Sequence, residues 1–254
     1  MTMPQSSPQI INIVDNKISE EQGVVAQWCS SNWRPILAEL ISTTLLLLVG
    51  CMTTIPIDTL PYQNAMYAPF GFGLVVMFNI QIFGHISGAF MNPAVTLAAL
   101  LYGSISISKA IAYVIAESIG AILGFGILTT LSPVLVKENG VCMTEVHPQL
   151  NTLQAVGIEI VLTTALNFLN CAVWDPVNRD KPDSVPIKFG LAIAGLSLAG
   201  GPLTGASMNP VRSLAPALWT GRWEDHWVYW VGPLIGGILP TLIYKFMFLR
   251  KKLE

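Results

Sequence analysis

The chain has 254 residues, of which 52% are hydrophobic and only 11% are charged. Soluble domains carry about 25% charged residues, so the composition excludes an ordinary soluble protein and indicates a membrane protein. The net charge of -2 gives no reason to expect a nucleic-acid partner. The first 33 residues are polar and contain no early apolar run, so no signal peptide is predicted.

Six segments are apolar enough to cross a bilayer, which takes about 20 residues of helix. They are 36–55, 68–83, 108–131, 153–173, 187–200 and 227–249. The second and fifth are short, and each runs directly into a repeated motif. The apolar segments that follow the motifs, 93–102 and 210–219, are about ten residues long, which is typical of half-spanning, re-entrant helices.

The repeated motif lies at 84–98, GHISGAFMNPAVTLA, and again at 201–215, GPLTGASMNPVRSLA, with eight of the fifteen positions identical. In each copy an Asn precedes a Pro, which is a strong signal for a helix start. The copies are 117 residues apart, about half the chain, which indicates a duplicated unit rather than a solenoid. Matching interrupted segments in the two halves of a membrane chain predict a pore or substrate site between the repeats.

Positive charges predict the orientation. One side of the membrane would carry Arg34, Lys109, Arg179, Lys181, Lys188, Lys245, Arg250, Lys251 and Lys252, and the other Lys137 and Arg222. By the positive-inside rule both termini are then cytoplasmic. We expect a cytoplasmic tail at 1–33, a channel domain at 34–250 with inverted repeats at about 34–132 and 153–250, and a cytoplasmic end at 251–254. Three spans in each half make the two half-helices enter from opposite faces and meet near the midplane.

The chemistry predicted at this meeting point is polar but uncharged. Segments 86–91 and 203–208 are expected to be irregular, which is tolerated at membrane depth only inside protein or beside a wet cavity. Their carbonyl groups would form a ladder of acceptors, and Asn92 and Asn209 would offer N–H donors. Both half-helix N-termini point at the same place, so their dipoles would repel cations and protons.

Other chemistries find little support in the sequence. The four cysteines, Cys29, Cys51, Cys142 and Cys171, show no paired spacing, and we interpret them as structural or incidental. No Cys/His cluster has metal-site spacing, so neither a metal nor another cofactor is expected. No nucleophile, base and orienting group accompany the motifs, so an enzyme is not expected and no residue is assigned a catalytic role.

The motifs SGAFMNPAVT and TGASMNPVR resemble the aquaporin, or major intrinsic protein, family over about residues 30–250. Supporting matches are Ala38-Glu39, Gly157-Ile158-Glu159 and Trp230-Val231-Gly232-Pro233. The resemblance implies an all-α membrane protein with six transmembrane helices and two re-entrant half-helices, assembled as a homotetramer. It places the pore motifs at Asn92, Pro93, Ala94, Asn209, Pro210 and Val211. Val211 departs from the usual Ala at a position that faces packing.

The resemblance also implies a narrow selectivity filter made of Phe72, Ser197, Ala206 and Arg212. Ser197 stands where strictly water-selective members carry His, and Ala206 where many carry Cys, so the filter would be wider. Ser213 departs from the Asp that the glycerol-facilitator branch places after the Arg. The chain therefore resembles water-type aquaporins with a widened filter, as in some insect aquaporins that pass glycerol.

Two interpretations remain open for the membrane-embedded carboxylates Glu39 and Glu159. They are either anchors for the irregular loops, as the resemblance implies, or proton-coupling sites. His85 is either a cytoplasmic pH gate or a residue of the pore wall. The expected pore lining is His85, Ile86, Ser87, Gly88, Leu203, Thr204 and Gly205.

The expected function is passive conduction of water and small uncharged solutes such as glycerol and urea, with exclusion of ions and protons. A strictly water-selective channel is the first alternative, and an ion-coupled secondary transporter is the second. The expected partners are these permeants, the lipid bilayer and further copies of the chain. The expected location is the plasma membrane, which the chain would cross several times.

Overall fold

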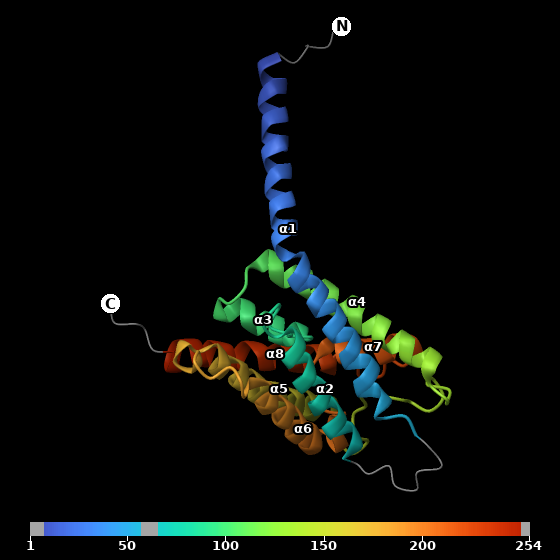
Figure 1. Cartoon of the computed structure of the whole chain (residues 1–254). Helices are drawn as coiled ribbons and strands as arrows, with labels where there is room; N and C mark the ends of the chain where they lie inside the picture. Colours follow the sequence, from blue (N-terminus) through green and yellow to red (C-terminus); the bar gives the residue numbers. More distant parts are fainter. Residues whose placement is uncertain (1–7, 57–65, 250–254) are drawn as a thin grey trace.

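The computed structural model describes residues 8–56 and 66–249, and within these ranges its regular structure is helical throughout (Figure 1). The helices are α1 (Pro8–Met52), α2 (Tyr67–Phe83), α3 (Pro93–Tyr102), α4 (Ile107–Leu131), α5 (Thr152–Trp174), α6 (Val185–Thr204), α7 (Pro210–Thr220) and α8 (Val228–Ile243). A 3-10 turn, Pro176–Asn178, follows α5, and a π-helical segment, Tyr244–Phe248, continues α8. Each predicted span and each predicted half-helix corresponds to one of these helices.

The first helix is longer than the predicted span. From residue 8 onward the polar segment expected to be a tail continues α1, and it projects from the body of the bundle (Figure 1). Residues 1–7 and the expected C-terminal end, together with Arg250, Lys251 and Lys252, lie outside the described residues.

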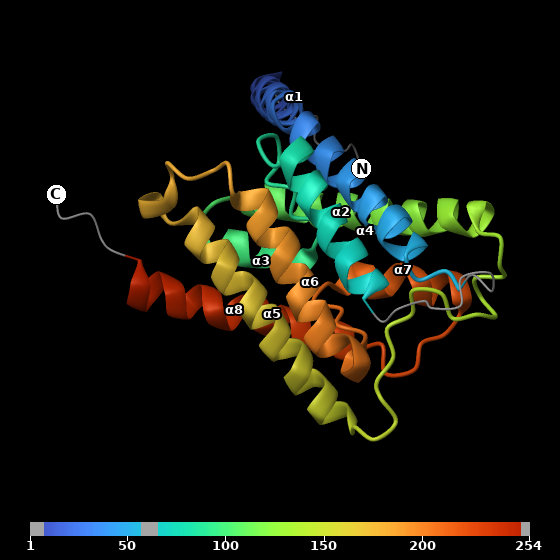
Figure 2. The same cartoon turned by 60° about the horizontal axis from the view of Figure 1, so that its bottom comes forward.

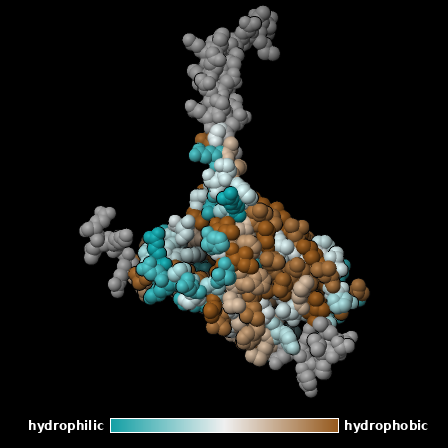
Figure 3. All heavy atoms as spheres, viewed as in Figure 1, coloured by the Kyte–Doolittle hydropathy of each residue, from teal (hydrophilic) through white to brown (hydrophobic). Residues whose placement is uncertain are grey.

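Five described helical segments are long and apolar enough to cross a membrane: Ala26–Met52, Ile107–Leu131, Thr152–Trp174, Val185–Thr204 and Val228–Phe248. Helix α2 has 17 residues, at the short end of the range of about 17–25 residues that can span. Much of the face of the bundle seen in Figure 3 is hydrophobic, and Ile111, Ile115 and Ile119 of α4 are all exposed. Such a surface suits contact with lipid.

The two halves repeat the same packing. Helix α1 packs along α4 in the first half, α5 packs along α8 in the second, and α2 lies beside α6 between the halves (Figure 2). Gly120 and Gly124 of α4 lie against backbone carbonyls of α1, and Gly232 and Gly236 of α8 lie against α5 in the same way. Small residues four apart let membrane helices approach closely, so each half is a tight helix pair that supports one half-helix.

The half-helices begin at the predicted Asn-Pro pairs. The side chain of Asn92 accepts a hydrogen bond from the Ala94 N–H, and that of Asn209 accepts one from the Val211 N–H. The irregular segment before α7 is shorter than predicted, because Leu203 and Thr204 belong to α6 and only residues 205–209 are non-helical. The helix continues to Gly205, whose φ of 78° gives the left-handed conformation that ends a helix.

Candidate functional site

A cavity of about 750 Å³ runs through the bundle between the repeats. Its lining includes Ala68 and Pro69 around the start of α2, and Pro182 and Asp183 just before α6. Helices α2 and α6 run in opposite directions, so these residues mark the two ends of the cavity, called here the α2 end and the α6 end. Both Asn92 and Asn209 line it between the ends.

Two buried carboxylates hold the irregular segments. The carboxylate of Glu39 accepts hydrogen bonds from the Phe90 and Met91 N–H groups, at 3.0 and 2.8 Å. The carboxylate of Glu159 accepts the equivalent bonds from Ser207 and Met208, at 2.9 and 2.8 Å. Both glutamates are fully buried. These contacts fit the anchor interpretation, because a buried backbone N–H must be paired.

The backbone of the two segments has the same unusual shape. Ala89 and Met91 have φ angles of 50° and 54°, and Ala206 and Met208 have 47° and 52°. Positive φ is uncommon for residues other than glycine. Four such residues at matching positions therefore show that this conformation belongs to the repeated motif. The repeated conformation presents two successive N–H groups to each glutamate.

The two half-helices are joined where they meet. The Asn92 amide donates a hydrogen bond to the Met208 carbonyl, and the Asn209 amide donates one to the Met91 carbonyl, each at 2.8 Å. Each side-chain oxygen meanwhile caps its own half-helix. The positive ends of both helix dipoles therefore face the same part of the cavity.

All four residues of the expected filter line the cavity. Arg212 is only 8% exposed, and its Nη1 donates to the Cys142 carbonyl at 2.6 Å. Its guanidinium carbon lies 4.9 Å from the centre of the Phe72 ring, in a cation–π contact. Ser197 and Ala206 contribute a small hydroxyl and a methyl group to the same wall. One positive charge is thus fixed against an aromatic face at the α2 end.

The expected pore lining is placed in two groups. His85, Gly88 and Gly205 line the cavity, whereas Ile86, Ser87, Leu203 and Thr204 are not part of its lining. The polar side chains of the second group bond within the protein, because the Ser87 hydroxyl accepts from the Ala89 N–H and the Thr204 hydroxyl donates to Glu159. They support the irregular segments from behind.

Two features of this region were not expected from the sequence. Cys51 and Cys142 form a disulfide across 91 residues, which gives these two of the four cysteines a structural role. Distant partners leave no local spacing signal, so the pair was not recognisable. Cys29 and Cys171 are free. Glu117 of α4 is a third fully buried carboxyl, and it accepts a bond from the Thr96 hydroxyl at 2.6 Å. A carboxylate inside an apolar segment is the signal that would have found it.

Metal chemistry receives no support from the described residues, in which no group of three or more His, Cys, Asp or Glu side chains is placed to hold a metal ion.

Comparison with known proteins identifies the arrangement. Residues 27–244 match the family model described as "Major intrinsic protein". The chain is 37% identical to Aquaporin-4 of Mus musculus over 225 residues, which cover 87% of this chain and 69% of that protein. It is 38% identical to the lens fiber major intrinsic protein of Lithobates pipiens over 219 residues, covering 85% and 82% of the two chains.

A solved structure shares the fold. The X-ray structure of the aquaglyceroporin from Plasmodium falciparum superposes with a TM-score of 0.75 at 22% identity, covering 84% of this chain and 96% of the other. The duplicated motifs, the two half-helices and the cavity between the repeats agree with these matches. This chain therefore belongs to the major intrinsic proteins, which are membrane channels and not enzymes.

Proposed function

We propose that the chain is a passive channel for water and for small uncharged solutes such as glycerol and urea, and that it excludes ions and protons. The observation that carries this proposal is the composition of the cavity wall at the α2 end. Arg212 is fixed there against Phe72, and the small residues Ser197 and Ala206 belong to the same lining. The filter thus combines one positive charge, one apolar face and small side chains that leave the constriction wide.

Water passes because the wall replaces its hydrogen bonds. A primary amide carries two donor hydrogens, and each of Asn92 and Asn209 uses one of them on a carbonyl of the opposite repeat. The second hydrogen serves a molecule in the cavity. Cations are repelled by Arg212 and by the two helix dipoles, so a neutral molecule meets partners where a cation meets a barrier.

Glycerol and urea are larger, and the small side chains admit them. A hydroxymethyl group at Ser197 and a methyl group at Ala206 leave width at the filter, and the ring of Phe72 offers an apolar face for CH groups. The hydroxyl groups of glycerol bond to Arg212 and to the backbone carbonyls. In the alternative, a strictly water-selective channel, neighbouring side chains occupy the space that the small residues at 197 and 206 leave open.

An ion-coupled transporter would need a free carboxylate in the cavity. Both oxygens of Glu39 and both oxygens of Glu159 are bonded to backbone N–H groups of the irregular segments. This supports loop anchoring by these two residues and argues against proton coupling through them.

We propose that both termini are cytoplasmic and that the channel resides in the plasma membrane. The Cys51–Cys142 disulfide supports this orientation, because disulfides persist in oxidising compartments. The pair belongs to one core cluster with Phe72 at the α2 end, whereas Lys188 lies in the first turn of α6 at the other end. Assembly as a homotetramer, with one pore in each subunit, is part of the same proposal, and chemical crosslinking of the purified channel tests it.

Stopped-flow light scattering of purified protein in liposomes tests the function directly. We expect water, glycerol and urea permeabilities well above those of protein-free liposomes, with no uphill uptake driven by a proton or sodium gradient. Water flux alone would leave the strictly water-selective channel. Gradient-driven accumulation of a solute would instead establish a transporter.

A further inference from the structure

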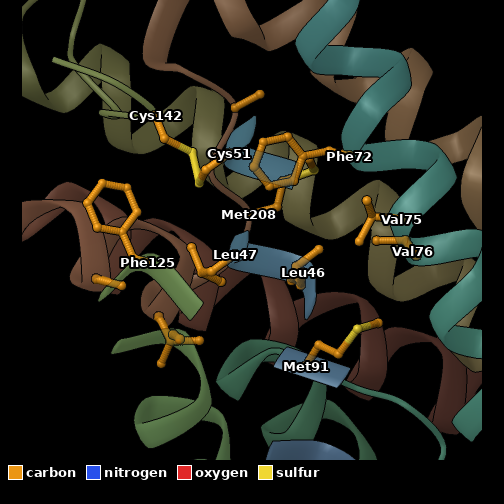
Figure 4. Packing of buried hydrophobic residues seen from close by; sticks show 14 of the residues in the cluster. Leu46, Leu47, Cys51, Phe72, Val75, Val76, Met91, Phe125, Cys142 and Met208 are labelled. Carbon is orange, nitrogen blue, oxygen red and sulfur yellow. A yellow bond between two sulfur atoms is a disulfide. The ribbon is translucent and has the colours of Figure 1, made fainter. Parts of the chain in front are cut away.

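The disulfide joins the end of a membrane-spanning helix to a non-helical connection. Cys51 lies in the last turn of α1 and is fully buried, and Cys142 lies in residues 132–151 between α4 and α5, with 5% of its surface exposed. Figure 4 shows the pair in the hydrophobic core beside Phe72 and Met208. A long connection is thereby tied to the bundle at one point.

The backbone of Cys142 contacts the proposed filter. The Cys142 carbonyl is the acceptor for the Arg212 guanidinium, and Cys142 itself has a φ of 62°. The residues beside it are held by longer backbone bonds, from Val141 to Val136 at 3.3 Å and from Met143 to Gly140 at 3.2 Å. The Thr144 hydroxyl donates to the Ser213 hydroxyl at 2.7 Å, and the disulfide to α1 adds a covalent restraint at Cys142 itself.

The same turn of α1 also positions the aromatic partner of Arg212. Gly50 precedes Cys51, and a side chain at Gly50 would collide with the Phe72 ring. Phe72 in turn carries the cation–π contact to Arg212. Adjacent residues of α1 therefore set both groups that hold the guanidinium.

We propose that the Cys51–Cys142 disulfide is a positioning element of the selectivity filter, which fixes the Cys142 carbonyl and through it the Arg212 guanidinium. The inference rests on the proposed role of Arg212 in the filter. Without the disulfide, the guanidinium loses its fixed acceptor and samples the lumen. A narrower lumen hinders glycerol more than water, while the positive charge that excludes cations is retained.

The test compares the double variant Cys51→Ala/Cys142→Ala with wild type in liposomes. The variant keeps the Cys142 carbonyl and removes only the covalent tie. Cys171→Ala is the matched control, because Cys171 is a buried but free cysteine. We expect the ratio of glycerol to water permeability to drop about threefold or more in the double variant, with proton leak unchanged and the control equal to wild type. The ratio does not depend on how much protein is incorporated.

Thiol labelling of denatured, unreduced protein provides the first check. Labelling of Cys29 and Cys171 alone supports the disulfide, and labelling of all four cysteines overturns the proposal. A folded double variant with the wild-type permeability ratio also overturns it. If the double variant is not recovered folded, wild type is reduced in liposomes and compared with oxidised wild type. Thiol labelling then confirms that the disulfide was reduced. Loss of the fold in both forms would show that the bond holds the bundle, and would overturn a role in positioning.

A double-mutant cycle identifies the residue through which the disulfide acts. On an Arg212→Val background, removal of both cysteines should leave the permeability ratio unchanged. An equal drop on both backgrounds overturns the proposal, because the bond would then act without Arg212. If Arg212→Val alone alters neither the ratio nor the ion leak, the proposed filter fails first and this inference fails with it.

Discussion

The two ends of the cavity are built from equivalent positions of the duplicated unit, but their chemistry differs. The α2 end carries Phe72, Ser197, Ala206 and Arg212. The positions 117 residues away are Phe189, Ile80, Ala89 and Val95, and all four also line the cavity. The Phe and the Ala are kept at both ends. The position equivalent to Ser197 is Ile80, and the position equivalent to Arg212 is Val95. At these four pairs of positions, the charged side chain and the hydroxyl group therefore occur only at the α2 end.

The backbone shows no such difference. Both irregular segments have paired residues of positive φ, a glutamate bound to two N–H groups, and an Asn that donates to the opposite repeat. Every one of these features satisfies buried backbone groups, which in a membrane have no water to replace the partner. The duplication thus keeps the groups that hold the backbone, while two of the four compared lumen positions differ, and these are Ser197 and Arg212, to which we assign solute selection.

The largest expected effect breaks the shared support. Glu159→Gln should lower the yield of folded channel more than it changes selectivity, because a neutral amide has one acceptor oxygen for groups that now use two. The loss of charged hydrogen bonds costs about 2 kcal/mol. Glu39→Gln should lower the yield to a similar degree, since each glutamate also bonds one hydroxyl group, that of Ser87 for Glu39 and that of Thr204 for Glu159.

Size-exclusion chromatography and thermal unfolding of both variants measure the loss of folded channel. Normal yield with altered solute selectivity in Glu159→Gln would contradict an anchoring role.

A change at Ser197 tests the width of the α2 end. Ser197→His places a ring beside Phe72 and Arg212, and should cut glycerol and urea flux about tenfold or more while most water flux remains. Ser197→Ala is the control, because it keeps the side chain small and should retain glycerol flux. Stopped-flow at matched protein levels measures both. Equal glycerol flux in the His variant and in wild type would place solute selection elsewhere.

Removal of the charge makes the α2 end resemble the other end. Arg212→Val copies Val95, and should preserve water flux while raising proton or cation leak by roughly tenfold, because it removes a fixed charge from a site of low dielectric constant. Arg222→Val is the control, since Arg222 is a cation that does not belong to the cavity lining. Conductance in planar bilayers measures the leak. An unchanged leak would mean that the helix dipoles suffice.

The smallest effect concerns His226, in the turn before α8. Burial lowers the pKa of this imidazole below its ordinary value of 6.5, and its Nε2 accepts a hydrogen bond from the Trp230 indole at 3.1 Å. The unfolded chain therefore binds a proton at a higher pH than the folded chain does. Stability should decrease as the pH falls below about 6.5, by less than about 1 kcal/mol for this group.

Thermal unfolding of wild type and of His226→Gln measures the contribution of His226 to stability. The scans run from about pH 5.5 to about pH 7.5, one unit either side of the ordinary histidine pKa. A wild-type curve no steeper than that of the variant would contradict it.

The helices and half-helices were predictable because their signals are local. Apolar length gives a span, and Asn before Pro gives a helix start, so the prediction of an all-α channel fold is confirmed by the structure and by the comparisons. The irregular segment before α7 starts two residues later than predicted, at 205 instead of 203, because nothing before Gly205 marks where α6 must stop.

The support behind the filter was not predictable, because it depends on partners far apart in the sequence. The acceptor for Arg212 is a backbone carbonyl, which any residue supplies, and Cys51 and Cys142 are 91 residues apart. Local spacing carries no information about such pairs. Glu117 is the exception, since an ionisable residue within an apolar segment is visible in the sequence.

The bonds between the two asparagines and the opposite repeat also bear on how the chain is made. Asn92 reaches a carbonyl 116 residues ahead of it, and Asn209 reaches one 118 residues behind it. During synthesis the first re-entrant segment therefore emerges long before its partner exists. Until α7 has been inserted, the first re-entrant segment has its helix cap but lacks its hydrogen bonds to the second repeat. Docking of the two half-helices is thus a late event in biogenesis, and a chain that stops before residue 208 cannot complete it.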